Sequence, residues 1–190
     1  FTANDDIRQV KISADGNFIV AVSKNTKVYL FNRASNSPIQ TFNFSSDPNS
    51  VDISANGDYI VVGTSSTDEK IYLFNKNNNS PIWSYNALDS ITSVSISEDG
   101  EYITAITYRG ADGGAVLCFE KSSSLPLWKY ITSESTDSSL RNLISISADG
   151  KYIATGDEEN VYSFKLSDVK RPNAILYNPT DSISTTLDLS

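Results

Sequence analysis

The sequence predicts an all-β protein, a β-propeller of four-stranded antiparallel blades, and three repeated phrases predict it. The first phrase reads Ile-Ser-Ala-Asp-Gly or a close variant and returns in steps of 41, 43 and 50 residues, at Ile12, Ile53, Ile96 and Ile146. The second is an apolar strand around Phe31, Phe74, Phe119 and Phe164. The third is a proline-containing segment at Pro38, Pro81, Pro126 and, more loosely, Pro172. A period in the forties with several short strands per repeat is typical of a propeller blade.

Each repeat divides into four strands, named a to d, as the second repeat shows. Strand a, residues 50–54, alternates in polarity and ends at Asn56-Gly57, a pair that favours the positive φ angles of a tight hairpin. Strand b, residues 59–63, is a β-branched run that suits a buried strand. Strand c, residues 71–74, follows a polar loop, and Pro81 opens strand d, where a missing N–H is tolerated.

Strand c is apolar on both of its faces. In the first repeat Val28 and Leu30 point to one side, and Tyr29 and Phe31 point to the other. A sheet with one face in water would alternate apolar with polar residues, so both faces of each blade are expected to be covered by neighbouring blades. Cys118 occupies a strand c position as a small buried hydrophobe. The aromatic residues that we expect to pack between blades are Trp83, Trp128, Phe31, Phe74, Phe119 and Phe164.

The repeats predict one propeller domain over residues 1–190 that is incomplete. Its blades are expected at about 7–43, 50–85, 91–130 and 143–177, with residues 183–189 repeating strand a as the inner strand of a fifth blade. Propellers of this blade type close with about seven or eight blades. Three explanations stay open: a fragment of a longer propeller, which we favour, two chains that complete one eight-bladed ring, or a closed four-bladed ring. An unpaired final strand is an aggregation hazard, which disfavours an open monomer.

Composition excludes several classes of function. The net charge of −8 and the pI of about 4.5 do not fit nucleic-acid binding, which needs a basic surface. No apolar run approaches the length of a membrane span, about 20 residues. Few lysines and many Ser, Thr and Asn residues favour an extracellular or cell-surface location, with the cytoplasm as the alternative. Asn43 and Asn78 open glycosylation sequons.

The chain has no histidine, which excludes Ser-His-Asp and Cys-His nucleophiles and histidine-ligated metals. We therefore expect no catalytic residue and no cofactor. Carboxylates gather on one rim, formed by the b-to-c and d-to-a loops, and this acidic rim is expected to bind a basic protein partner. Its residues are Asp47, Asp68, Glu69, Asp112, Glu134, Asp137, Asp157, Glu158 and Glu159. No metal site is predicted, although Asp112, Asp157, Glu158 and Glu159 are candidates for a loosely held divalent cation.

Residues 93–103, a serine-rich strand, an Asp-Gly turn and an apolar strand, resemble a WD-repeat blade. The strand d segments 81–85 and 125–130 resemble the repeats of quinoprotein-like (PQQ-like) propellers. The chain departs from both families, because Phe31-Asn32 stands where Trp-Asp would and a single cysteine leaves no quinone cage. The resemblance therefore implies a shape rather than an activity.

These observations predict a non-enzymatic scaffold for protein–protein interaction, a segment of a larger and cell-surface protein. One alternative is part of a quinoprotein-like or propeller-type enzyme whose active site lies in other blades. Another is a surface-assembly subunit, joined as a homodimer or edge to edge through open blade edges.

Overall fold

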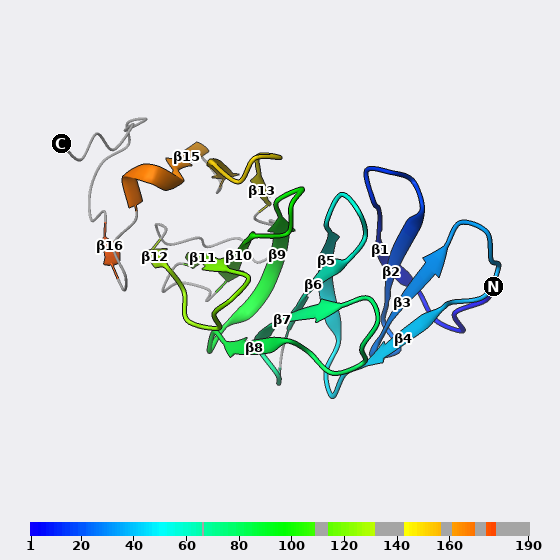
Figure 1. Cartoon of the computed structure of the whole chain (residues 1–190). Coiled ribbons are helices and arrows are strands. Elements are labelled where there is room, and N and C mark those ends of the chain that lie inside the picture. The colour runs from blue at the N-terminus through cyan, green and yellow to red at the C-terminus, as the bar shows by residue number, and fades with distance from the viewer. Residues whose placement is uncertain (66, 109–113, 132–142, 157–160, 170–173, 178–190) are drawn as a thin grey trace.

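The computed structural model describes residues 1–65, 67–108, 114–131, 143–156, 161–169 and 174–177. Its sheets follow one another as blades, from right to left in Figure 1, and confirm the all-β propeller architecture. The first blade holds β1 (Ile7–Ile12), β2 (Phe18–Ser23), β3 (Lys27–Asn32) and β4 (Gln40–Asn43). The second holds β5 (Pro48–Ile53), β6 (Tyr59–Thr64), β7 (Lys70–Asn75) and β8 (Trp83–Asn86).

The third blade begins with the regular meander and carries an additional strand. It holds β9 (Ser90–Ile96), β10 (Tyr102–Tyr108), β11 (Ala115–Glu120) and β12 (Trp128–Ile131), with β16 (Ala174–Tyr177) at its edge. The fourth blade holds β13 (Ile144–Ile146), β14 (Tyr152–Gly156) and β15 (Val161–Lys165), followed by the 3-10 helix η2 (Leu166–Val169). Each meander is antiparallel from strand to strand, as the sequence predicts.

The repeated phrase, Ser-x-Asp-Gly or, in the second blade, Ser-Ala-Asn-Gly, makes the a-to-b turn of every blade. In the first blade the Ser13 hydroxyl donates to Asp15 Oδ1 at 2.6 Å and accepts from the Phe18 N–H at 3.0 Å. Gly16 follows with a φ of 69°, a conformation that costs glycine little. The turns are also joined to one another, because the Ala55 N–H donates to the Glu98 carbonyl at 2.9 Å and the Glu98 N–H donates to the Ala148 carbonyl at 3.0 Å.

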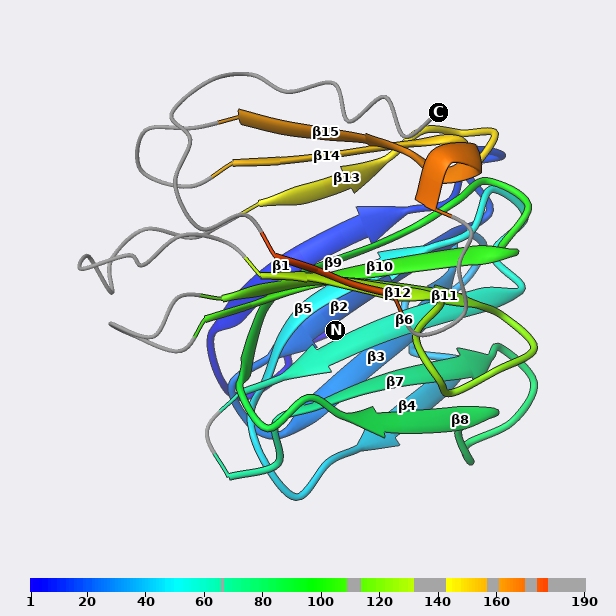
Figure 2. The same ribbon diagram turned by 90° about the vertical axis from the view of Figure 1, so that its left-hand side faces the viewer.

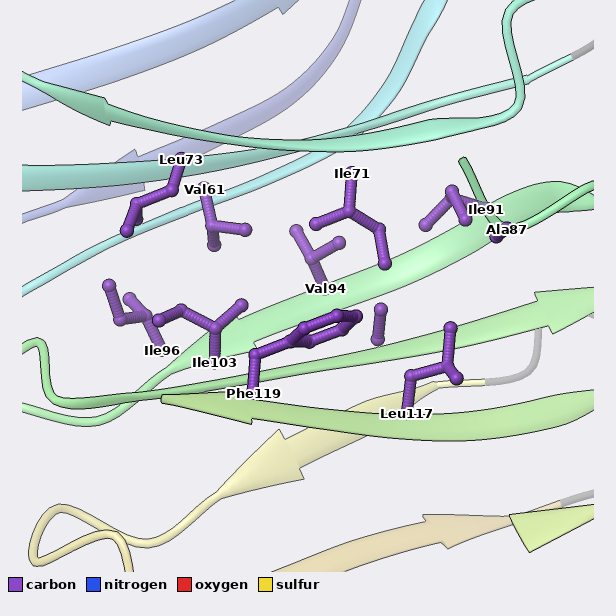
Figure 3. Packing of buried hydrophobic residues seen from close by; sticks show 11 residues of the cluster. Val61, Ile71, Leu73, Ala87, Ile91, Val94, Ile96, Ile103, Leu117 and Phe119 are labelled. Atoms are coloured by element: carbon purple, nitrogen blue, oxygen red, sulfur yellow. The ribbon is translucent and has the colours of Figure 1, made fainter. Parts of the chain in front are cut away.

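The core lies between the blades rather than inside any one of them. Figure 3 shows the second interface, where Leu73 and Ile71 of the second blade face Ile103 and Phe119 of the third. Two further clusters fill the interfaces on either side of it. Each strand c is therefore covered on both faces where a blade has two neighbours.

Aromatic contacts repeat at each interface, with a strand c phenylalanine against a strand d ring of the preceding blade. The ring centroids lie 4.6 Å apart for Phe42–Phe74, 5.1 Å for Tyr85–Phe119 and 5.0 Å for Tyr130–Phe164. Trp83 and Trp128 join these pairs, at 5.3 Å from Phe119 and 5.1 Å from Phe164. Such pairs contribute about 0.5–1.5 kcal/mol each beyond their buried area.

The fourth repeat departs from the predicted four-stranded antiparallel meander. Residues 174–177 pair in parallel with β12 of the third blade, as Figure 2 shows, and the described sheet of the fourth blade has three strands. The chain departs from the repeat after strand c. In the first two blades an Asn side chain closes this turn, as where Asn75 Oδ1 accepts from the Asn77 N–H. Lys165 takes that position in the fourth repeat, and η2 follows. The predicted inner strand of a fifth blade, 183–189, lies outside the described residues.

Candidate interaction surface

The innermost strands carry a β-bulge and a row of polar side chains. The register of β1, β5 and β9 shifts at Arg8, Asn49 and Thr92. A bulge re-aims the neighbouring side chains, and here it turns them toward the next blade. Asn49 accordingly donates to the Ile91 carbonyl at 3.0 Å, across the second interface.

The polar residue after each bulge bonds the backbone of the next inner strand. Gln9 Oε1 accepts from the Val51 N–H at 2.8 Å, and Ser50 Oγ accepts from the Val94 N–H at 3.0 Å. Ser93 Oγ repeats the contact with the Ile144 N–H at 3.4 Å. Side chains thus supply the hydrogen bonds that neighbouring inner strands do not make backbone to backbone.

Asp52 extends this row and is the one carboxylate in it. Its Oδ2 accepts from the Ser95 hydroxyl at 3.0 Å and from the Ile96 N–H at 3.1 Å, and Lys11 lies 3.5 Å from Oδ1. Its side chain is 14% exposed, so these contacts satisfy a largely buried charge. Sequence reasoning missed this role, although the alternation of polar and apolar residues in strand a carries the signal.

Asp68 of the acidic rim lies inside its loop instead of facing solvent. Its Oδ2 accepts from the Tyr72 hydroxyl at 2.6 Å and from the Thr64 hydroxyl at 3.3 Å, while Lys70 Nζ lies 2.9 Å from Oδ1. Burial opposes ionisation of this carboxyl, but the donors at Tyr72, Lys70 and Thr64 outweigh it and hold the pKa of Asp68 below its usual value. The same burial, together with the Asp68 charge, raises the pKa of Tyr72.

The other described residues of the acidic rim lie next to this loop. Asp47 forms an ion pair with Arg8 at 2.8 Å, and its side chain is 39% exposed. The backbone of Glu69 has a φ of 50°, and its carbonyl accepts from the Ala87 N–H at 2.9 Å. The b-to-c and d-to-a loops of the second blade are thereby tied to each other. Six predicted members of the rim lie outside the described residues: Asp112, Glu134, Asp137, Asp157, Glu158 and Glu159.

An open depression of about 440 Å³ lies where the inner strands meet the outer face of the fourth blade. Gln9, Lys11 and Ser93 contribute polar groups to it, and Leu143 and Val161 contribute apolar ones. Within the described ranges no group of three or more Asp, Glu, His or Cys side chains is placed to hold a metal ion. The four candidate cation ligands, Asp112, Asp157, Glu158 and Glu159, all belong to the residues that are not described.

Comparison with known proteins identifies the repeat in the first half of the chain. The model of the family described as WD domain, G-beta repeat, matches residues 1–32 and residues 36–75. Each match ends on the last residue of a strand c, Asn32 or Asn75. No curated protein matches the chain in sequence. In the part of the chain that the structure describes, no helix is long and apolar enough to cross a membrane.

The resemblance to quinoprotein-like repeats stays a prediction. WD-repeat domains generally act as non-enzymatic scaffolds on which proteins assemble. The matched repeats span the first blade and the second through its strand c, and the third blade begins with the same meander, so the comparison supports WD-type repeats in residues 1–75.

Proposed function

We propose that this chain is a non-enzymatic scaffold, a segment of a larger cell-surface protein that binds a basic protein partner through its acidic rim. The observation that carries the proposal is the hydrogen bonding of Asp68 in the loop between β6 and β7. Asp68 accepts three side-chain hydrogen bonds inside that loop, so its charge organises the loop rather than meeting a partner. The neighbouring Glu69 is then presented from a constrained backbone.

Charge supports the same surface. The chain carries 23 Asp and Glu residues against 15 Lys and Arg residues, and nine of these acids stand in the loops of the acidic rim. An acidic surface steers a basic partner and selects against acidic ones. The polar side chains of the inner strands, by contrast, are engaged in bonds between blades, as Ser50 and Asp52 show.

Two sequons support the cell-surface setting. Asn43 and Asn78 are both exposed, as an acceptor for glycan must be. Secretion of the chain from a eukaryotic host, followed by glycosidase treatment and mass spectrometry, tests whether both positions are accessible to the modifying enzyme.

A charge-reversal pair tests the rim directly. Glu69→Lys and Glu98→Lys change the net charge equally, but Glu98 lies on the opposite rim, in an a-to-b turn. Titration with polylysine at several salt concentrations is expected to show weaker binding for Glu69→Lys than for Glu98→Lys. Equal weakening by the two variants would mean that net charge alone governs binding, and it would overturn the role of the rim.

A further inference from the structure

We propose that the outer face of the first blade binds the outer face of the fourth blade in a second copy of this chain. The inference is independent of the acidic rim. It follows from contacts that recur at two or all three of the internal interfaces. The first blade carries one side of these contacts, and the fourth blade, at the other end of the described arc, carries the other side.

The first blade exposes the apolar residues that its counterparts bury. Val10 and Ile12 are 55% and 61% exposed, whereas Val51 and Ile53, which hold the same places in the second blade, are 0% and 7% exposed. Val94 and Ile96 are likewise buried in the third blade. The outer face of the first blade therefore exposes the kinds of residue that the internal interfaces bury.

A glycine and an aromatic ring show what the other side must offer. At the second interface the Tyr59 ring lies over the turn at Gly100, so close that an added Cβ would stand 2.6 Å from it. Phe18 lies over Gly57 and Tyr102 over Gly150 in the same way. Gly16, in the first blade, has open space at this position. Tyr152, the corresponding ring of the fourth blade, is 50% exposed.

A cation completes the same contact. The Lys76 ammonium lies 4.4 Å from the centre of the Phe18 ring, and the Lys121 ammonium lies 4.7 Å from the centre of the Tyr59 ring. Arg33 stands at the corresponding position of the first blade and is exposed. Docking of the fourth blade would bring Tyr152 over Gly16 and beneath Arg33.

At the internal interfaces a strand d ring packs against a strand c phenylalanine, and the first blade already carries a ring in that position. The described fourth blade has three strands, so its sheet presents no strand d ring. The Phe1 ring lies 5.2 Å from Phe31 and 4.9 Å from Tyr29, the geometry of the strand d pairs at the internal interfaces. The Phe1 ring thus contacts strand c of the first blade as a strand d ring does at the internal interfaces.

The outer face of the fourth blade fits the rest of this surface. Leu143 and Val161 are 68% and 80% exposed and would cover Val10 and Ile12. Ser145 is exposed at the place where Ser95 Oγ accepts from the Ile146 N–H at 3.4 Å, so it would accept from the Ile12 N–H. A head-to-tail pair would use both faces twice and close by two-fold symmetry.

The mass of the chain in solution tests the proposal. Light scattering after size exclusion, from about 1 to 100 µM, is expected to give at least twice the chain mass of 20.8 kDa. Ile12→Asp and Val161→Asp should each return the chain to a monomer. Ile82→Asp is the control, because Ile82 is an exposed isoleucine away from both faces, 48% exposed, and it should leave the assembly intact.

Mixing the two monomeric variants identifies which faces meet. Ile12→Asp keeps an intact fourth-blade face, and Val161→Asp keeps an intact first-blade face, so together they should form a one-to-one pair through a single interface. Circular dichroism of each variant checks that it is folded. A monomeric parent chain at 100 µM would overturn the proposal, as would an assembly that survives Ile12→Asp or loses mass equally with Ile82→Asp.

Discussion

The contact between a turn glycine and the preceding blade is open to a quantitative test at Gly100. Gly100 has a φ of 74°, and an added Cβ would lie 2.6 Å from Cδ2 of Tyr59. Gly16 has nearly the same backbone, with a φ of 69°, but nothing within 4 Å. Both Gly100→Ala and Gly16→Ala therefore carry the cost of a left-handed backbone, and only Gly100→Ala carries the cost of displacing a neighbouring ring.

The shared cost is the left-handed backbone, about 1–2 kcal/mol for a residue with a Cβ. The cost specific to Gly100→Ala is displacement of the Tyr59 ring, for which overpacking suggests about 1–3 kcal/mol. Displacing the ring also disturbs its contact with Lys121. Gly100→Ala is thus expected to lower the free energy of unfolding by about 1–3 kcal/mol more than Gly16→Ala.

Urea denaturation followed by circular dichroism measures both values, at a concentration where the chain is monomeric. For a chain of this size each kcal/mol corresponds to about 2–4 °C in Tm, which heating can check. Gly57→Ala and Gly150→Ala, whose Cβ atoms would meet Phe18 and Tyr102, should follow Gly100→Ala. If Gly16→Ala destabilises the chain as much as Gly100→Ala, the packing of blades over these glycines does not contribute as described.

Three further perturbations probe the interior. Ser50→Ala leaves the buried Val94 N–H without its acceptor and should cost about 1–3 kcal/mol in urea denaturation, while the exposed Ser84→Ala should change the stability little. The pKa of Asp68 is lower in the folded chain than in the unfolded chain, where it is about 3.9, so the ionised carboxylate stabilises the fold at higher pH. This contribution is lost as the pH falls through the folded pKa. Asp68→Asn should therefore flatten the pH dependence of unfolding below about pH 4, and an unchanged slope would contradict the assignment. Burial raises the pKa of Cys118, so a thiol reagent should label it far faster in denaturant than in the folded chain, and fast native labelling would refute its burial.

The blade architecture was predictable because it depends on local signals that recur. The Asp-Gly turn fixes each a-to-b hairpin, and a strand c with apolar residues on both faces requires a neighbour on each side. Phe74, Phe119 and Phe164 are accordingly buried. Phe31 carries the same pattern but is half-buried, and the ring of Phe1 lies beside it.

Other features depended on contacts that the sequence does not reveal. Parallel pairing of β16 with β12 joins segments far apart in the chain, and no local pattern marks the partner. The sequence places Asp68 in a polar loop and so predicts an exposed carboxylate, yet donors from Thr64, Lys70 and Tyr72 all bond to it. A count of rim charges cannot separate such a carboxylate from one that faces solvent.

The backbone bonds that join one a-to-b turn to the next confine variation to the other side of the molecule. These turns have the same length in all four repeats, and the c-to-d turns have the same length in the first three. The b-to-c and d-to-a connections differ in length from repeat to repeat, with the longest between Ile131 and Ile144. Lengthening or replacing those connections leaves the hydrogen bonds between the a-to-b turns unchanged. The scaffold is therefore suited to acquire new binding specificities there without refolding its blades.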